Sequence, residues 1–173
     1  MPALPTLLAL TVFPLLVIVA AIGDVRTMRI PNKLNAAIAL SFFPAAFMAG
    51  MPFGVMGMHL MAFAVVLAAM MGLFFWGKIG GGDAKMIAAA SLWVGWGEPL
   101  LIFFVITALA GGVLAVIMKL WEMLRVEQGV WGADGALRKT LARSFDLPYG
   151  VAIAAGALVA YPTGWWQSVL FAA

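Results

Sequence analysis

Two of the seven carboxylates in the sequence stand at the ends of long apolar segments. Asp24 directly follows the run VIVAAIG, and Asp83 directly precedes AKMIAAASLWVGW. An ionisable group at the edge of a membrane is costly to place there and is a candidate functional group. Two such carboxylates within a few Å of each other share a proton. One can then act as a general base on a water while the other polarises a carbonyl.

The strength of this coupling can be estimated. At about 4 Å and an effective dielectric constant near 20, the repulsion of about 4 kcal/mol would carry one carboxyl pKa from about 4 toward neutral pH. Which acid holds the proton stays open, because the two titrations are coupled. In the structural alternative, each acid instead forms an ion pair at the membrane surface. Arg26 and Lys85 are the nearest basic residues in the sequence.

The residues before Asp83 are unusual for a plain loop. Three glycines in a row before a helix cost backbone entropy and remove every Cβ, so another peptide could approach the acid closely. A flexible turn between two helices is the plainer interpretation. The glycines are Gly80, Gly81 and Gly82.

The residues after Asp24 indicate a short fixed turn. Pro31 disfavours helix at the residue before it, and Asn32 is expected to be the N-cap of the next helix. This turn would hold Asp24 near the membrane surface. The need for a turn is enough to explain both residues.

The composition makes the bilayer part of the solvent. Hydrophobic residues make up 65% of the 173 positions and charged residues 10%, against averages of about 45–50% and about 25% in soluble domains. The absence of cysteine excludes disulfides and thiolate chemistry, and a single histidine, His59, argues against zinc. No metal or other cofactor is expected. Nucleic acid is not an expected partner, because the basic residues are scattered among hydrophobic segments.

Six apolar segments predict an all-α, polytopic membrane protein with about six transmembrane helices. We expect one membrane-embedded domain over residues 1–173. The first segment carries no Lys or Arg before its apolar run, so it is interpreted as a retained span rather than a cleaved signal. The fourth is short for a span. The segments cover residues 3–23, 34–50, 54–76, 84–97, 100–120 and 149–169.

The ten Lys and Arg residues set the expected orientation. They fall in or beside the first, third and fifth loops, whereas the other loops and both termini carry none. The positive-inside rule then places the odd loops in the cytoplasm and both termini outside. In this orientation Asp24 and Asp83 lie at the same cytoplasmic edge.

The remaining aromatic and polar features are interpreted as membrane anchors. His59 is expected at the outer interface. The stretch 121–148 is expected to be a cytoplasmic loop, with an amphipathic helix on the lipid surface around residues 137–145. The tryptophans expected in the outer interfacial belt are Trp93, Trp96, Trp165 and Trp166.

Three stretches, taken together and in order, resemble the type IV prepilin peptidase family of GxGD-type membrane aspartic proteases. The first is an Asp at the end of a span that leads to Ile30-Pro31-Asn32-x-Leu34, and the second is Gly80-x-Gly82-Asp83-x-Lys85. The third, LPYGVAIAAG at 147–156, is similar to the family's final span. The resemblance implies that Asp24 and Asp83 are catalytic. The supporting or substrate-binding motif residues would be Gly80, Gly81, Gly82, Lys85, Pro31 and Asn32.

The resemblance also implies a substrate and a compartment. Substrates would be prepilins or pseudopilins, cut just after a glycine between a basic leader and a hydrophobic helix, in a bacterial inner membrane. Pilus or secretion assembly proteins are possible partners beside membrane lipid. The sequence lacks the N-terminal domain with paired CxxC motifs that larger members carry, so zinc and N-methyltransferase activity are not expected. The compact form is similar to the CpaA/TadV-like branch, which matures Flp-type pilins for tight adherence.

Three rival functions remain open. An ion-coupled carrier would use two membrane-edge acids to bind a cation. A structural subunit of a membrane secretion complex would use them in salt bridges between subunits. A presenilin-like or signal-peptide-clearing protease would cut within helices rather than at a leader junction.

Overall fold

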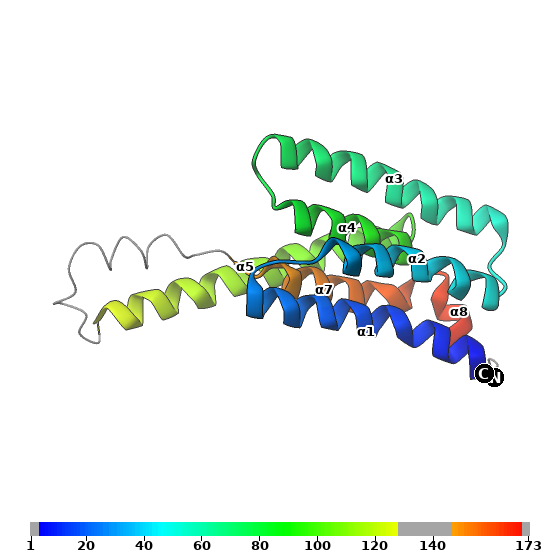
Figure 1. Cartoon of the computed structure of the whole chain (residues 1–173), viewed down its shortest axis with the longest axis horizontal. Helices are drawn as coiled ribbons and strands as arrows, with labels where there is room; N and C mark the ends of the chain where they lie inside the picture. Colours follow the sequence, from blue (N-terminus) through cyan, green and yellow to red (C-terminus); the bar gives the residue numbers. More distant parts are fainter. Residues whose placement is uncertain (1–3, 128–146, 171–173) are drawn as a thin grey trace.

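All regular elements in the described residues, 4–127 and 147–170, are helical in the computed structural model. This confirms the expected all-α class (Figure 1). The elements are α1 (Leu4–Thr27), α2 (Asn32–Met48), α3 (Phe53–Phe75), α4 (Gly81–Val94), α5 (Glu98–Glu127), α7 (Tyr149–Ala160), the 3-10 helix η1 (Tyr161–Thr163) and α8 (Trp166–Leu170).

Three of these helices are long and apolar enough to cross a membrane. The segments are Leu10–Thr27, Phe53–Phe75 and Glu98–Trp121, and only 28%, 17% and 17% of their windows are buried inside the protein. Such extensive apolar exposure would be unfavourable in water, and a helix satisfies its own backbone in lipid. The helical stretch Tyr149–Thr163 is also apolar but is shorter than these three segments. The chain is a helical membrane protein.

The shortness of the fourth segment is explained by its position inside the bundle. α4 packs against α2, α3, α5 and α7, and all its residues from Met86 to Val94 are buried. In Figure 1 it runs between α3 on one side and the layer of α1, α2 and α7 on the other. A 14-residue apolar helix is typical of a bundle interior rather than of a lipid-facing span.

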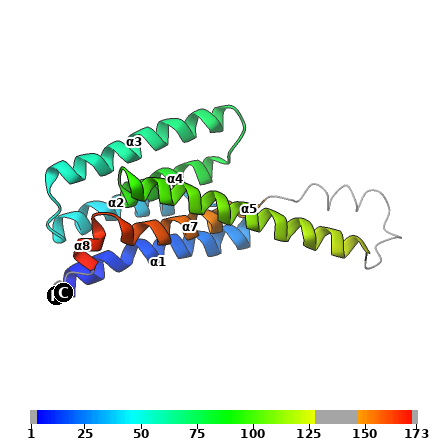
Figure 2. The same cartoon turned by 180° about the vertical axis from the view of Figure 1, so that it is seen from behind.

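The two ends of the bundle carry different parts of the chain. The start of α1 and the end of α8 lie at one end (Figures 1 and 2). The α1–α2 and α3–α4 connections and the start of α7 lie at the other end, beyond which α5 extends. The basic first and third loops therefore share one end. The side of the membrane that this end faces stays a prediction from the charges.

The last two expected segments differ in detail. α5 continues to Glu127, so the beginning of the expected loop at 121–148 is helical. The amphipathic helix predicted around residues 137–145 lies outside the described residues. The sixth segment is not one helix, because α7 ends at Ala160 and η1, which contains Pro162, turns the chain into α8.

Two of the four expected belt tryptophans lie in the core instead. Trp93 and Trp166 are completely buried and stack on each other with ring centroids 5.3 Å apart. Their indole N–H groups donate to the carbonyls of Ile38 and Trp93, at 2.7 and 2.6 Å. The interfacial interpretation was wrong for both, because α4 ends inside the bundle and the turn at η1 brings Trp166 back over it. Trp96, in contrast, is 42% exposed.

His59 is likewise buried rather than interfacial. Its side chain is 3% exposed, and its Nδ1 donates to the carbonyl of Leu92 at 2.7 Å. The ring stacks on Phe42, with centroids 5.4 Å apart. His59 therefore joins α3 to the end of α4 in the core.

Candidate active site

Asp24 lies in the last turn of α1 rather than in the loop that follows the helix. α1 runs on to Thr27, and the Asp24 side chain is 5% exposed. Its Oδ2 accepts a hydrogen bond of 2.8 Å from the backbone N–H of Gly150, the second residue of α7. The first N–H groups of a helix lack partners within the helix. The Asp24 carboxylate satisfies one of them and joins α1 to α7.

Asp83 is the third residue of α4 and is half-buried. The expectation that all three preceding glycines come before the helix was wrong, because Gly81 and Gly82 are helical and Gly80 is the N-cap. Each glycine nevertheless leaves space for a neighbour. A Cβ at position 80 would lie 3.0 Å from Asp83 Oδ2.

The other two glycines allow two other elements to approach. A Cβ at position 81 would lie 3.2 Å from the Phe74 ring of α3, and one at position 82 would lie 3.4 Å from Cβ of Ile30. Ile30 belongs to the turn after Asp24 and is buried. The glycines thus bring the turn after α1 close to the turn that carries Asp83.

Pro31 and Asn32 begin α2, but their roles differ from those expected. Pro31 is the N-cap, with φ −62° and ψ 137°, and no side chain caps the helix. Asn32 is the first helical residue, and its Oδ1 accepts a 2.8 Å hydrogen bond from Lys85 Nζ. Asn32 therefore connects α2 to α4, and the contact links two of the motif residues, Asn32 and Lys85, at one end of the bundle.

The ion pairs of the structural alternative are not formed in the described part of the chain. Lys85 donates to Asn32 rather than to Asp83, and Asp24 accepts from Gly150. Arg26 is exposed. Simple charge neutralisation does not explain the position of either acid.

The two acids nevertheless act on each other. Asp83 lies outside the three long membrane-crossing segments. Burial, followed by the negative charge of Asp24, raises the pKa of Asp83 to about 6. The structure thus brings Asp24 and Asp83 within electrostatic range at the same end of the bundle, although 59 positions separate them in the sequence.

The sequence patterns did not identify two residues of this site, Asn35 and Gly150. Asn35 is 5% exposed, and its Nδ2 donates to the carbonyl of Gly82 at 3.1 Å. A second asparagine one helical turn after Asn32, on a mostly apolar helix, was the available signal. Gly150 belongs to the LPYG stretch that resembles the family, but no pattern in the sequence predicted its contact with Asp24.

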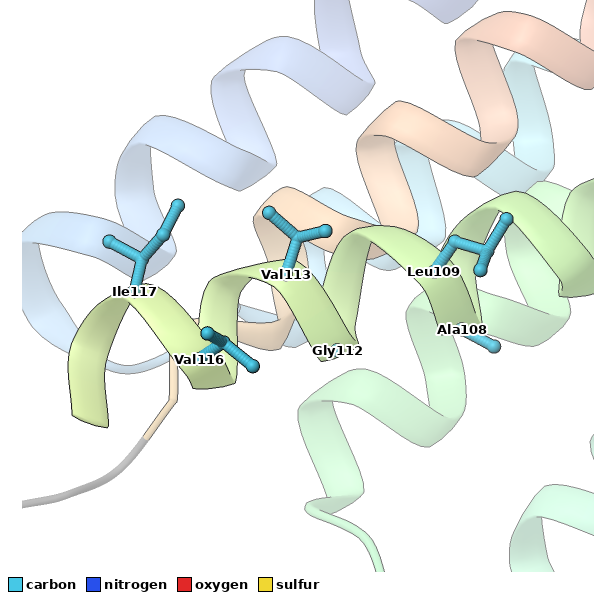
Figure 3. Close-up of a pocket in the computed structure, with 6 residues that line it drawn as sticks. All are labelled: Ala108, Leu109, Gly112, Val113, Val116 and Ile117. Atoms are coloured by element: carbon cyan, nitrogen blue, oxygen red, sulfur yellow. The ribbon is translucent and has the colours of Figure 1, made fainter. Parts of the chain in front are cut away.

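No metal cluster adds to this chemistry within the described residues. No group of three or more His, Cys, Asp or Glu side chains there could hold a metal ion. A shallow groove of about 380 Å³ lies on α5 (Figure 3) and has no ionisable side chain in its lining. The lining residues are Ala108, Leu109, Gly112, Val113, Val116 and Ile117. Hydrolytic chemistry is therefore expected at the two acids rather than in the groove.

Fold and site together define a helical membrane protein with two interacting acids at one end of its bundle. Residues 11–116 match the model of the type IV leader peptidase family. The match covers more than half of the chain, including Asp24 and Asp83, and the chain belongs to this family of peptidases. The similar stretch at 147–156 lies beyond the matched residues. No curated protein and no solved structure matches the chain.

Proposed function

We propose that the protein is an aspartic endopeptidase that removes the basic leader from prepilins or pseudopilins, with Asp24 and Asp83 as the catalytic pair. The observation that supports this most directly is the effect of the Asp24 charge on the pKa of Asp83, in a chain of the leader peptidase family. A carboxyl with a raised pKa beside a second carboxyl is the arrangement that lets one acid donate a proton while the other accepts one.

We assign the proton to Asp83, because burial and the neighbouring Asp24 raise its pKa to about 6. Asp24, as the charged partner, removes a proton from the attacking water while Asp83 donates its proton to the carbonyl oxygen of the scissile bond. The resulting tetrahedral diol collapses when the protonated Asp24 gives its proton to the leaving nitrogen. One hydroxyl returns its proton to Asp83, so that both acids regain their starting states.

The position of the pair suits a substrate whose cleavage site lies next to a hydrophobic helix. We place the Asp24 end of the bundle at the cytoplasmic face of a bacterial inner membrane, because the basic first and third loops lie there. Water is available at that edge while the pilin helix stays in lipid. The absence of cysteine from these 173 residues favours an Flp-type pilin and the CpaA/TadV-like branch.

The test is cleavage of a co-expressed prepilin by single-residue variants. The proposal requires that Asp24→Asn and Asp83→Asn each leave the precursor uncut while the variant protein accumulates normally in the membrane. Cleavage by either variant would overturn it.

A further inference from the structure

Two asparagines on α2 hold the first turn of α4 on either side of Asp83. Asn32 accepts from the Lys85 ammonium at 2.8 Å, and Asn35 donates to the Gly82 carbonyl at 3.1 Å. Asn32 and Asn35 are three residues apart and share a face of α2. Gly82 and Lys85 are three residues apart on α4, and Asp83 lies between them.

The two contacts differ in their surroundings. The Asn32–Lys85 bond is exposed to solvent, where hydrogen bonds are readily exchanged for water. Asn35 is 5% exposed, and it binds the carbonyl of the peptide group that links Gly82 to Asp83. Its contact is the one that can fix the direction of the Asp83 side chain.

Asn35 is poorly suited to a purely structural role. Its Oδ1 is buried without a hydrogen-bond partner in the described residues, and an unpaired buried acceptor is destabilising. Turning the amide over would place Oδ1 against the Gly82 carbonyl, so the donor must face Gly82. An apolar side chain of the same size would fill this space without an unpaired oxygen.

We propose that Asn35 is a positioning residue that fixes the Gly82–Asp83 peptide and so orients the Asp83 carboxyl toward its partner Asp24. This inference rests on the proposed function for its effect on catalysis. Its effect on the α4 turn does not depend on that function.

The test combines two measurements on the purified full-length protein carrying Asn35→Leu, a substitution of similar volume. Amide hydrogen exchange in peptides spanning residues 80–86 should become about 3- to 10-fold faster, because the turn loses a hydrogen bond. Prepilin cleavage should show kcat lowered about 10- to 100-fold with KM within about twofold of wild type, since the reacting group is displaced. The thermal unfolding temperature should not fall.

Thr107→Val is the matched control. Thr107 carries the other buried side-chain oxygen without a partner in the described residues, on α5 and next to Gly156 rather than Asp83. Its isosteric replacement also removes an unpaired polar atom. Exchange at residues 80–86 and kcat should both stay at wild-type values.

The outcomes separate the alternatives. Wild-type exchange or wild-type kcat in Asn35→Leu would overturn the inference, and a raised KM with normal kcat would make Asn35 a substrate contact instead. If Asn35→Leu does not accumulate, the same measurements are made on Asn35→Ala, and failure of both to fold would show a structural role only. Cleavage by Asp83→Asn would defeat the proposed function, whereas the exchange measurement would still decide whether Asn35 holds the turn.

Discussion

The backbone N–H of Gly150 donates to Oδ2 of Asp24 at 2.8 Å, across 126 positions of sequence. The bond joins the end of α1 to the N-terminus of α7, where unpaired N–H groups favour a negatively charged partner. It also gives a physical role to the LPYG stretch, which lies outside the residues that match the family. The start of α7 therefore forms part of the local environment of the Asp24 carboxylate.

Gly150→Ala should therefore impair cleavage. A Cβ at position 150 would lie 2.9 Å from both Cβ and Oδ2 of Asp24, closer than two such atoms can approach, so the carboxylate must move. A displacement of about 1 Å at a catalytic group costs on the order of 100-fold in rate. The measurement is kcat of the purified variant on a prepilin.

Gly23→Ala is the control for this prediction. Gly23 precedes Asp24 on α1, and nothing lies within 4 Å of a Cβ placed there. Alanine also favours the helix by about 1 kcal/mol over glycine. Gly23→Ala should cleave at the wild-type rate, and an equal loss in both variants would show that the close contact at Gly150 is not the cause.

The sequence was informative where a local pattern determines the structure. The apolar runs predicted the helices, and the alternation of basic loops placed Asp24 and Asp83 at one end. In the fold, the end of α1 and the start of α4, which carry these acids, lie at the same end of the bundle (Figure 1). It was misleading for Trp93, Trp166 and His59, because an aromatic or polar residue at the end of an apolar run looks the same whether lipid or other helices cover it. Only the tertiary packing distinguishes a residue of the interfacial belt from a residue of the protein core.

The site itself depends on contacts that no spacing encodes. Asn32 matched an N-cap pattern, yet its side chain binds Lys85 on another helix. Gly150 and Asn35 reach their partners across 126 and 47 positions. Such partners become visible only when α1, α2, α4 and α7 are assembled into one bundle.

The activity should depend on pH through Asp83. Burial and the charge of Asp24 raise the pKa of Asp83 to about 6, and the proposed mechanism needs its protonated form. That form predominates below pH 6 and falls about tenfold per pH unit above it. We expect kcat/KM for prepilin cleavage to decrease as pH rises through about 6. A flat profile from about pH 5 to about pH 8 would contradict the role of Asp83 as the proton donor.

The orientation can be tested with single cysteines, since the chain has none of its own. Arg29, Pro52 and Glu98 are exposed, at opposite ends of the bundle: residue 29 in the α1–α2 turn, and residues 52 and 98 at the starts of α3 and α5. In intact cells an impermeant maleimide should label Pro52→Cys and Glu98→Cys but not Arg29→Cys. The reverse labelling would place the two acids outside.

Cleavage should not require a metal ion, because the proposed reaction uses only two carboxylates and water. Prolonged treatment with a chelator should leave kcat unchanged, and loss of activity restored by zinc would refute this.

His59→Ala should lower the unfolding free energy by about 1–3 kcal/mol through its lost bond to Leu92. The folded fraction of that variant should still cleave.

The measurement that tests the central claim most directly is the ratio of precursor to mature pilin, beside membrane abundance, for the two acids singly and together. Asp24→Asn and Asp83→Asn should each abolish cleavage at normal abundance, and the double variant should be no worse, because members of one catalytic unit are strongly non-additive. Glu98→Gln, an exposed acid at the other end of the bundle, should cleave normally. Substantial mature pilin from either single variant would contradict the account, and loss of the variant proteins themselves would favour a structural role for the pair.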